Sequence, residues 1–195
     1  MDIPGIPPLH HFTITSEGHQ QGYELWRTGT ALKRFTNAFV FDPAENKVLL
    51  GLKKRGFGKG IYNGFGGKLD PGETVADAAL RELQIRSDEM RPEWFAYPSL
   101  SVPSAVPSNT LPAFPYELMW KDDPLWMPHL LKSEYFVARV DYGPVPIPKP
   151  GQKVEPVLDG TAYLVDGERV EAGMQKWVCG VMDKQEWERA RVWEA

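Results

Sequence analysis

The chain has 195 residues, of which 42% are apolar, and a formal net charge of −4. This length and composition predict one globular domain with a substantial core, and the acidic charge argues against a general nucleic-acid or membrane-surface binder. The single cysteine, Cys179, has no partner for an intramolecular disulfide, and no apolar run approaches 18 residues, so we expect an intracellular setting, cytoplasmic or also nuclear.

The first part of the chain predicts a loosely docked extension followed by a hairpin. Residues 1–32 contain several prolines and little periodicity. Residues 35–41 and 47–53 are apolar and β-rich, and the turn-forming run 42–46 separates them. A further short strand is expected at 61–65.

A glycine-rich loop and a helix come next. Thr74 and Asp77 have the spacing of a helix-capping pair, and we expect the helix to continue to about Met90 because Pro92 disfavours helix before it. Apolar residues recur at a helical period and predict one buried stripe, with Arg81 and Glu82 off it: Val75, Ala76, Ala79, Leu80 and Leu83.

The second half is less regular. The proline-rich run 98–115 is expected to be a loop or insertion. Further elements are predicted as follows: a turn and short helix in 116–131, strands at 134–140, 157–158 and 161–165, a hairpin turn at 166–167, and a helix capped by Asp183 and Glu186 that runs to Trp193.

The stretch 51–83 carries the strongest signal of the chain. Gly67, then Glu73, then Arg81-Glu82-Leu83 have the spacing of the front part of a Nudix box, and the run Asn63 to Lys68 also resembles one branch of that family. This branch is the MutT-homologue group of oxidised purine nucleoside triphosphatases. The resemblance implies an α+β Nudix fold, with a mixed β-sheet between helices, over residues 33–165, and leaves 166–195 as a C-terminal extension.

The resemblance also implies a reaction. It is the hydrolysis of oxidised purine nucleoside triphosphates such as 8-oxo-dGTP and 2-hydroxy-dATP to monophosphate and pyrophosphate, which cleans the nucleotide pool. Mg²⁺ is the expected cofactor, with Mn²⁺ as a substitute, because divalent cations neutralise phosphate oxygens and activate water. The nucleotide is the expected partner of a monomer, with no nucleic-acid polymer and no membrane.

Residue roles follow from the same resemblance. Glu82 and the backbone of Gly66 would bind metal, Arg81 would hold Glu73, and Glu89 would reach the metal from a later segment. Trp120 would stack on the base while Asp122 and Asp123 bond its edge. The other expected substrate contacts are Thr36, Lys53, Phe57, Asn63, Phe65, Gly67 and Lys68.

The chain departs from the family pattern directly after Gln84. Ile85 and Arg86 stand where the family has two metal-binding glutamates, and residues 87–95 resemble a segment that normally comes some forty residues later. We hypothesise a skipped exon or faulty gene model, with 98–115 as retained intron, which sequencing of a full-length transcript tests. The alternative function is therefore a catalytically impaired or inactive nucleotide-binding protein, or an aberrant product.

Overall fold

The computed structural model describes residues 3–6, 8–28, 35–85, 89–96 and 111–190. The chain forms two compact units. The middle unit is Lys33–Trp120, and the terminal unit combines Met1–Leu32 with Lys121–Ala195. The domain boundaries expected at residues 32 and 165 stay a prediction.

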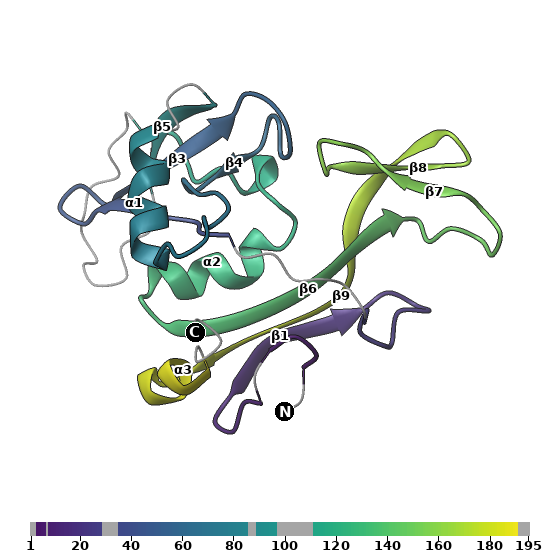
Figure 1. The fold of residues 1–195 in the computed structure, drawn as a ribbon, viewed down its shortest axis with the longest axis horizontal. Helices are drawn as coiled ribbons and strands as arrows, with labels where there is room; N and C mark the ends of the chain where they lie inside the picture. Colours follow the sequence, from purple (N-terminus) through teal and green to yellow (C-terminus); the bar gives the residue numbers. More distant parts are fainter. Residues whose placement is uncertain (1–2, 7, 29–34, 86–88, 97–110, 191–195) are drawn as a thin grey trace. The chain divides into compact units, whose positions relative to one another are not determined.

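The middle unit is built on one small sheet (Figure 1). Its strands are β2 (Val40–Asp42), β3 (Lys47–Lys53), β4 (Tyr62–Asn63) and β5 (Met90–Ala96), with β3 paired to the other three, all antiparallel. The helix α1 spans Val75–Ile85, and the 3₁₀ helix η1 spans Tyr116–Leu118.

The β2–β3 hairpin confirms the predicted hairpin, although its first strand is Val40–Asp42 and not the expected 35–41. Asp42 accepts hydrogen bonds from the backbone N–H groups of Ala44 and Glu45, at 3.1 and 3.3 Å, and Asn46 takes a positive φ of 49°. Asparagine tolerates this left-handed conformation better than most residues do. The turn aligns β3 so that Val48 and Leu50 are fully buried in the core.

The strand β5 corrects the expected end of the preceding helix. The last described residue of α1 is Ile85, and Met90, where helix was expected, opens β5. Pro92 lies inside this strand, opposite Gly51. Among the named strands, β5 pairs only with β3 and therefore lies at an edge of the sheet. Proline has no backbone N–H to donate to a neighbouring strand, so Pro92 is compatible with this edge position.

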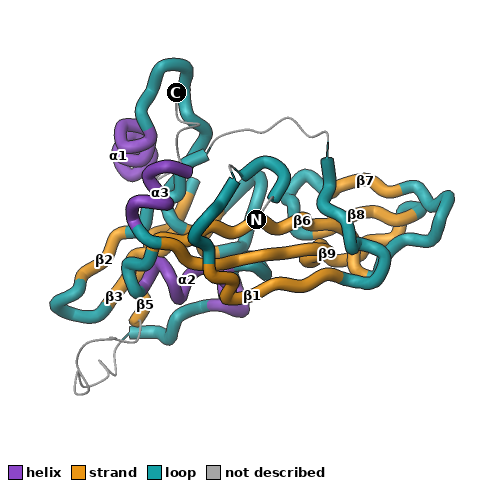
Figure 2. The backbone as a smooth tube through the Cα atoms, turned by 90° about the horizontal axis from the view of Figure 1, so that it is seen from below, coloured by secondary structure: helices purple, strands orange, loops and turns teal. Residues whose placement is uncertain are grey.

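The terminal unit is organised by a long strand, β9 (Glu168–Met182). Figure 2 shows β9 running between β1 (Thr13–His19) and β6 (Tyr135–Val145), and all these pairings are antiparallel. The strands β7 (Val154–Pro156) and β8 (Ala162–Val165) extend the sheet, while α2 (Asp123–Leu131) and α3 (Lys184–Ala190) are its helices.

Several elements of this unit differ from expectation. Residues 13–19 form a strand where a loose extension was predicted, and β9 was not predicted at all. The predicted strand at 157–158 is wrong, because β7 ends at Pro156 and Leu158 is almost fully exposed. The hairpin turn at 166–167 is confirmed by positive φ angles of 51° at Asp166 and 87° at Gly167.

Contacts that join distant parts of the chain stabilise the terminal unit. The core contains Ile3, Leu9, Val178, Met182 and Ala190, so the N-terminal segment packs with β9 and α3. The cap of α3 is confirmed, since Asp183 accepts the Glu186 N–H at 2.7 Å. Arg189 then bonds Glu186 and, with the His10 N–H, lowers the pKa of this glutamate to about 2.

The α+β class is confirmed by these elements. The ladders between the named strands of the described residues are antiparallel, and Ala96 and Ala113 form an isolated parallel bridge. None of the helices in the described ranges is long and apolar enough to cross a membrane. The expected loop at 98–115 lies outside the described residues except for 111–115, and the predicted helix end at Trp193 lies outside them too.

Candidate active site

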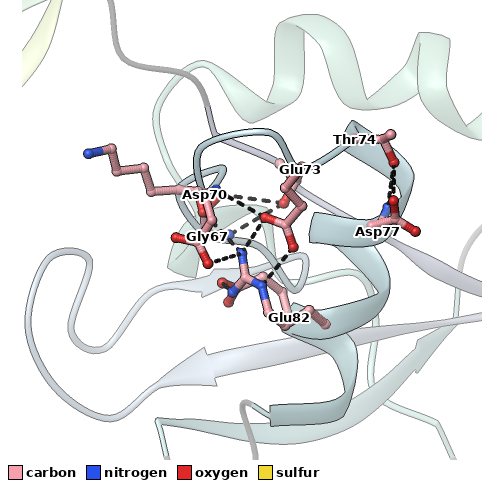
Figure 3. Close-up of polar contacts among 9 residues, drawn as sticks. Gly67, Asp70, Glu73, Thr74, Asp77 and Glu82 are labelled. Atoms are coloured by element: carbon pink, nitrogen blue, oxygen red, sulfur yellow. Dashed lines mark hydrogen bonds and ion pairs between the residues drawn. The ribbon is translucent and has the colours of Figure 1, made fainter.

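The start of α1 is fixed by the predicted cap. The Asp77 N–H donates to the Thr74 hydroxyl oxygen at 3.1 Å, and the Thr74 hydroxyl donates to the Asp77 carboxylate at 2.6 Å (Figure 3). Both contacts tie side chains to the first turn, where backbone N–H groups have no partner within the helix. The cap therefore sets where the helix begins relative to the glycine loop.

An ion-pair network joins the loop to the helix. The Arg81 guanidinium bonds both carboxylate oxygens of Glu73 at 2.8 Å, and its Nη1 bonds Glu82 at 2.6 Å. Arg81 also donates to the Lys68 carbonyl oxygen at 3.2 Å. The structure thus brings Glu73, Arg81 and Glu82 together, with a bidentate pair to Glu73 and a single bond to Glu82 that fix the guanidinium. Figure 3 shows Glu73 and Glu82 beside Gly67.

The network changes how Glu73 titrates. The hydrogen bonds from Arg81, and then that from the Asp70 N–H, lower the pKa of Glu73 from 4.5 to about 2. The same pairing raises the pKa of Arg81. Because the folded-state pKa of Glu73 is depressed, the pairing stabilises the fold fully above pH 4.5, and this contribution is lost as the pH falls towards 2.

We therefore expect Glu73→Gln to be most destabilising near neutral pH. The difference in unfolding free energy between wild type and variant should shrink between pH 4.5 and pH 2, as the wild-type carboxylate becomes protonated. Urea unfolding at several pH values measures it. The control is Glu117→Gln at an exposed position of η1, and a pH-independent difference for Glu73→Gln would contradict the assignment.

The orientation of α1 is the reverse of the sequence expectation. Of the expected buried stripe, Val75 is 45% exposed, Leu80 56% and Leu83 37%, whereas Ala78 and Glu82 are buried. The helical period was correct, but the face turned inwards carries Glu82, which is only 3% exposed. The carboxylate that was expected to meet a metal is therefore buried against Arg81.

Glu89 is engaged by other cations. Its carboxylate lies 3.3 Å from the Lys53 ammonium and 3.4 Å from the Arg55 guanidinium, and its carbonyl oxygen accepts the Lys54 N–H at 2.8 Å. Lys53, expected beside the substrate, therefore pairs with an expected metal ligand. Arg86 lies outside the described residues, as does the side chain of Ile85.

The carboxylates of the described residues do not form a cluster that would hold a metal ion on its own. Within the described part of the chain, no group of three or more His, Cys, Asp or Glu side chains is placed to hold a metal ion. Glu82 and Glu89 each face a cation of the protein instead. The expected metal contacts of Gly66, Glu82 and Glu89 therefore stay a prediction, and binding would require Glu82 and Glu89 to give up these cations.

An aromatic pair marks the expected base pocket of the middle unit. The rings of Phe57 and Trp120 stack with centroids 5.2 Å apart and an interplanar angle of 26°. Gly58, with a φ of 76°, lies under the indole, and a Cβ there would come within 3.1 Å of it. Phe57 is 66% exposed, so much of its ring surface is open to solvent.

The remaining expected pocket residues lie around the glycine loop. Thr36 is buried, and its N–H donates to the Gly67 carbonyl oxygen at 2.9 Å. Phe65 is buried and forms an isolated antiparallel β-bridge with Ala38. The side-chain oxygen of Asn63 accepts a hydrogen bond from the Asn37 amide at 2.7 Å. A Cβ on Gly66 would lie only 1.8 Å from the Thr36 carbonyl oxygen, so only glycine fits this approach.

The two acids expected to read the base belong to the terminal unit. Asp122 accepts the Tyr142 hydroxyl at 2.6 Å and the Trp126 indole N–H at 3.2 Å, and Asp123 is 1% exposed. Burial, followed by the charge of Asp122, raises the pKa of Tyr142. Trp120 and the acids are therefore divided between two units.

Two polar partners of expected site residues, Asn37 and Tyr142, were not predicted from the sequence. Asn37 bonds Asn63, and Tyr142 bonds Asp122, across separations of 26 and 20 residues. Such pairs depend on strand pairing rather than on local spacing. A single sequence carries no periodic signal for them.

The comparisons with known proteins agree with the motif. The oxidized purine nucleoside triphosphate hydrolase of Danio rerio is 32% identical over 147 residues, which take in 54% of this chain and 84% of the relative. The protein of the same name from Mus musculus is 32% identical over 149 residues, with 55% and 85% covered. No family model matches the chain.

The alignment is longer than the part of this chain that it contains. Because 54% of 195 residues is about 105, about 40 of the 147 aligned positions have no residue in this chain. The segment missing after Gln84 stays a hypothesis. With a third of the aligned positions identical and most of each relative covered, the chain belongs to the oxidized purine nucleoside triphosphate hydrolases of the Nudix family.

Proposed function

We propose that this chain hydrolyses oxidised purine nucleoside triphosphates, such as 8-oxo-dGTP and 2-hydroxy-dATP, to monophosphate and pyrophosphate. The observation that carries the proposal is the network in which Arg81 holds Glu73 and Glu82 beside the glycine loop. It joins the residues that the family motif requires, in a chain whose named relatives hydrolyse such nucleotides. The role would be nucleotide-pool sanitation by a monomer in the cytoplasm or nucleus.

Base recognition is assigned to the aromatic pair. Stacking on an indole is favourable for any purine and contributes about 1–3 kcal/mol per base. Trp120 and Phe57 would hold the ring, with Asn63, Phe65, Thr36 and Lys53 around it. Asp122 and Asp123 stay proposed readers of the base edge, which would require them to exchange their present partners for the ligand.

The cofactor proposal rests on the family rather than on the carboxylates. Nudix hydrolases use divalent metal, and we assign Mg²⁺, or Mn²⁺ in its place. Mg²⁺ retains several waters and takes one or two carboxylates together with substrate phosphates. Gly66, Glu82 and Glu89 stay the expected contacts, although the ion pairs of Glu82 and Glu89 oppose such a role. Gly67 and Lys68 would face the phosphates.

A second candidate function is nucleotide binding without turnover. The observation that favours it is the engagement of both retained metal carboxylates by cations of the protein. Ile85 and Arg86 in place of glutamates point the same way. The exposed apolar residues of α1 agree with a chain that lacks covering strands.

A product assay separates the candidates. Purified full-length protein with Mg²⁺ and 8-oxo-dGTP should release pyrophosphate and 8-oxo-dGMP, with undamaged dGTP turned over more slowly. Release of orthophosphate and 8-oxo-dGDP would contradict the proposed bond cleavage. Calorimetric binding of 8-oxo-dGTP with no product would establish the second candidate.

A further inference from the structure

The terminal unit contains a cavity to which no expected site residue contributes. Its volume is about 420 Å³. The Trp26 ring supplies an apolar wall, the buried Ile3 and Val178 lie beneath the cavity, and Glu17, His19 and Lys176 supply polar walls. This size and mixture are typical of small-molecule sites, which hold an apolar body and orient it with a few polar groups.

The ladder between β1 and β9 places the charged groups. Glu17 pairs with Val178 and His19 with Lys176, and opposed residues of an antiparallel pair share one face of the sheet. Glu17 and Lys176 are therefore diagonal neighbours, with side chains that leave the sheet about 7–8 Å apart. Among the ion pairs of the described residues, none joins this carboxylate to this ammonium.

The cationic side of the cavity is held in place. The Lys176 ammonium donates to the Glu24 carbonyl oxygen at 2.8 Å and lies 4.9 Å from the centroid of the Trp26 ring. The Arg139 guanidinium lies 4.6 Å from the same ring and fixes it further. Lysine has three donors, so Lys176 keeps donors for a ligand. A charged side chain that is already held in place loses less conformational entropy on ligand binding than a mobile one does.

We propose that this cavity binds a free apolar α-amino acid in its zwitterionic form. The ligand carboxylate would pair with Lys176, the ligand ammonium with Glu17, and the side chain would pack against the Trp26 ring above the buried Ile3 and Val178. A zwitterion fits because it satisfies two opposite charges that face one cavity and do not pair with each other. This site is independent of nucleotide hydrolysis.

Isothermal titration calorimetry with L-phenylalanine and L-leucine tests the proposal on the full chain near neutral pH. Glu17→Gln and Lys176→Gln should each weaken binding about ten- to hundredfold, as expected for loss of a charge-assisted hydrogen bond. The control variants are Lys153→Gln and Glu155→Gln, an exposed ion pair outside the cavity, and should bind normally. Circular dichroism confirms that each variant is folded.

Analogues of phenylalanine that lack one or both charges test each proposed ion pair separately. 3-Phenylpropionate lacks the ammonium, phenethylamine lacks the carboxylate, and N-acetyl-phenylalaninamide lacks both. Each should bind more weakly than L-phenylalanine, and Glu17→Gln should not alter the binding of 3-phenylpropionate. Absence of binding at millimolar amino acid, or equal binding of the uncharged analogue, would overturn the proposal.

Discussion

Replacing Ile85 and Arg86 together by glutamate is expected to raise Mg²⁺-dependent turnover of 8-oxo-dGTP at least about a hundredfold. The two positions follow Glu82 by three and four residues, which is the spacing of one helix face, and α1 extends to Ile85. Hard carboxylate oxygens suit Mg²⁺, and metal stabilisation of developing charge contributes several kcal/mol. Each 1.4 kcal/mol corresponds to about tenfold in rate.

The matched control for this gain is the double substitution to glutamine. It keeps the size and polarity of glutamate but supplies no negative charge, so turnover should stay near that of wild type. Pyrophosphate release under saturating nucleotide measures both variants, and EDTA should abolish the gain. Equal turnover by the glutamate and glutamine variants would show that the missing carboxylates do not limit the reaction.

The second large effect concerns the base pocket. Trp120→Ala should weaken binding of 8-oxo-dGMP about ten- to hundredfold, because it removes a stacking surface that contributes about 1–3 kcal/mol. The observed stack of Trp120 on Phe57 supports this assignment. The monophosphate is the right probe, since it reports base recognition without turnover.

The control for the pocket is another indole of the same unit. Trp94 lies on β5, with the Lys47 ammonium 4.9 Å from its ring centroid, and takes no part in the Phe57 stack. Trp94→Ala should leave affinity unchanged, and Trp120→Phe should retain part of it. If Trp94→Ala weakened binding as much as Trp120→Ala did, the loss would reflect damage to the fold.

Local signals predicted local structure. The β2–β3 hairpin and the Thr74 cap depend on side chains that bond backbone groups two or three residues away, so their residue types identify them. The period of α1 was also predictable. Which face of α1 turned inwards was not, because periodicity defines a stripe without showing what covers it.

Long-range structure was harder to predict. The strand β9 contains Gly173 and Gly180, which weaken the pattern of a strand, and its partners β1 and β6 lie far away in sequence. The site shows the same division. The resemblance placed Glu73 near Arg81, whereas the burial of Glu82 and the pairing of Glu89 with Lys53 depend on the folded unit.

Pyrophosphate release from 8-oxo-dGTP by the unaltered chain, compared with Glu82→Gln, tests the proposed function most directly. We expect slow, Mg²⁺-dependent release by wild type and none by the variant, because Glu82 is the proposed metal carboxylate that the ion-pair network holds beside the loop. Both proteins should bind 8-oxo-dGMP equally. Equal release by wild type and Glu82→Gln, or none by a folded wild type that binds nucleotide, would contradict hydrolysis at this site.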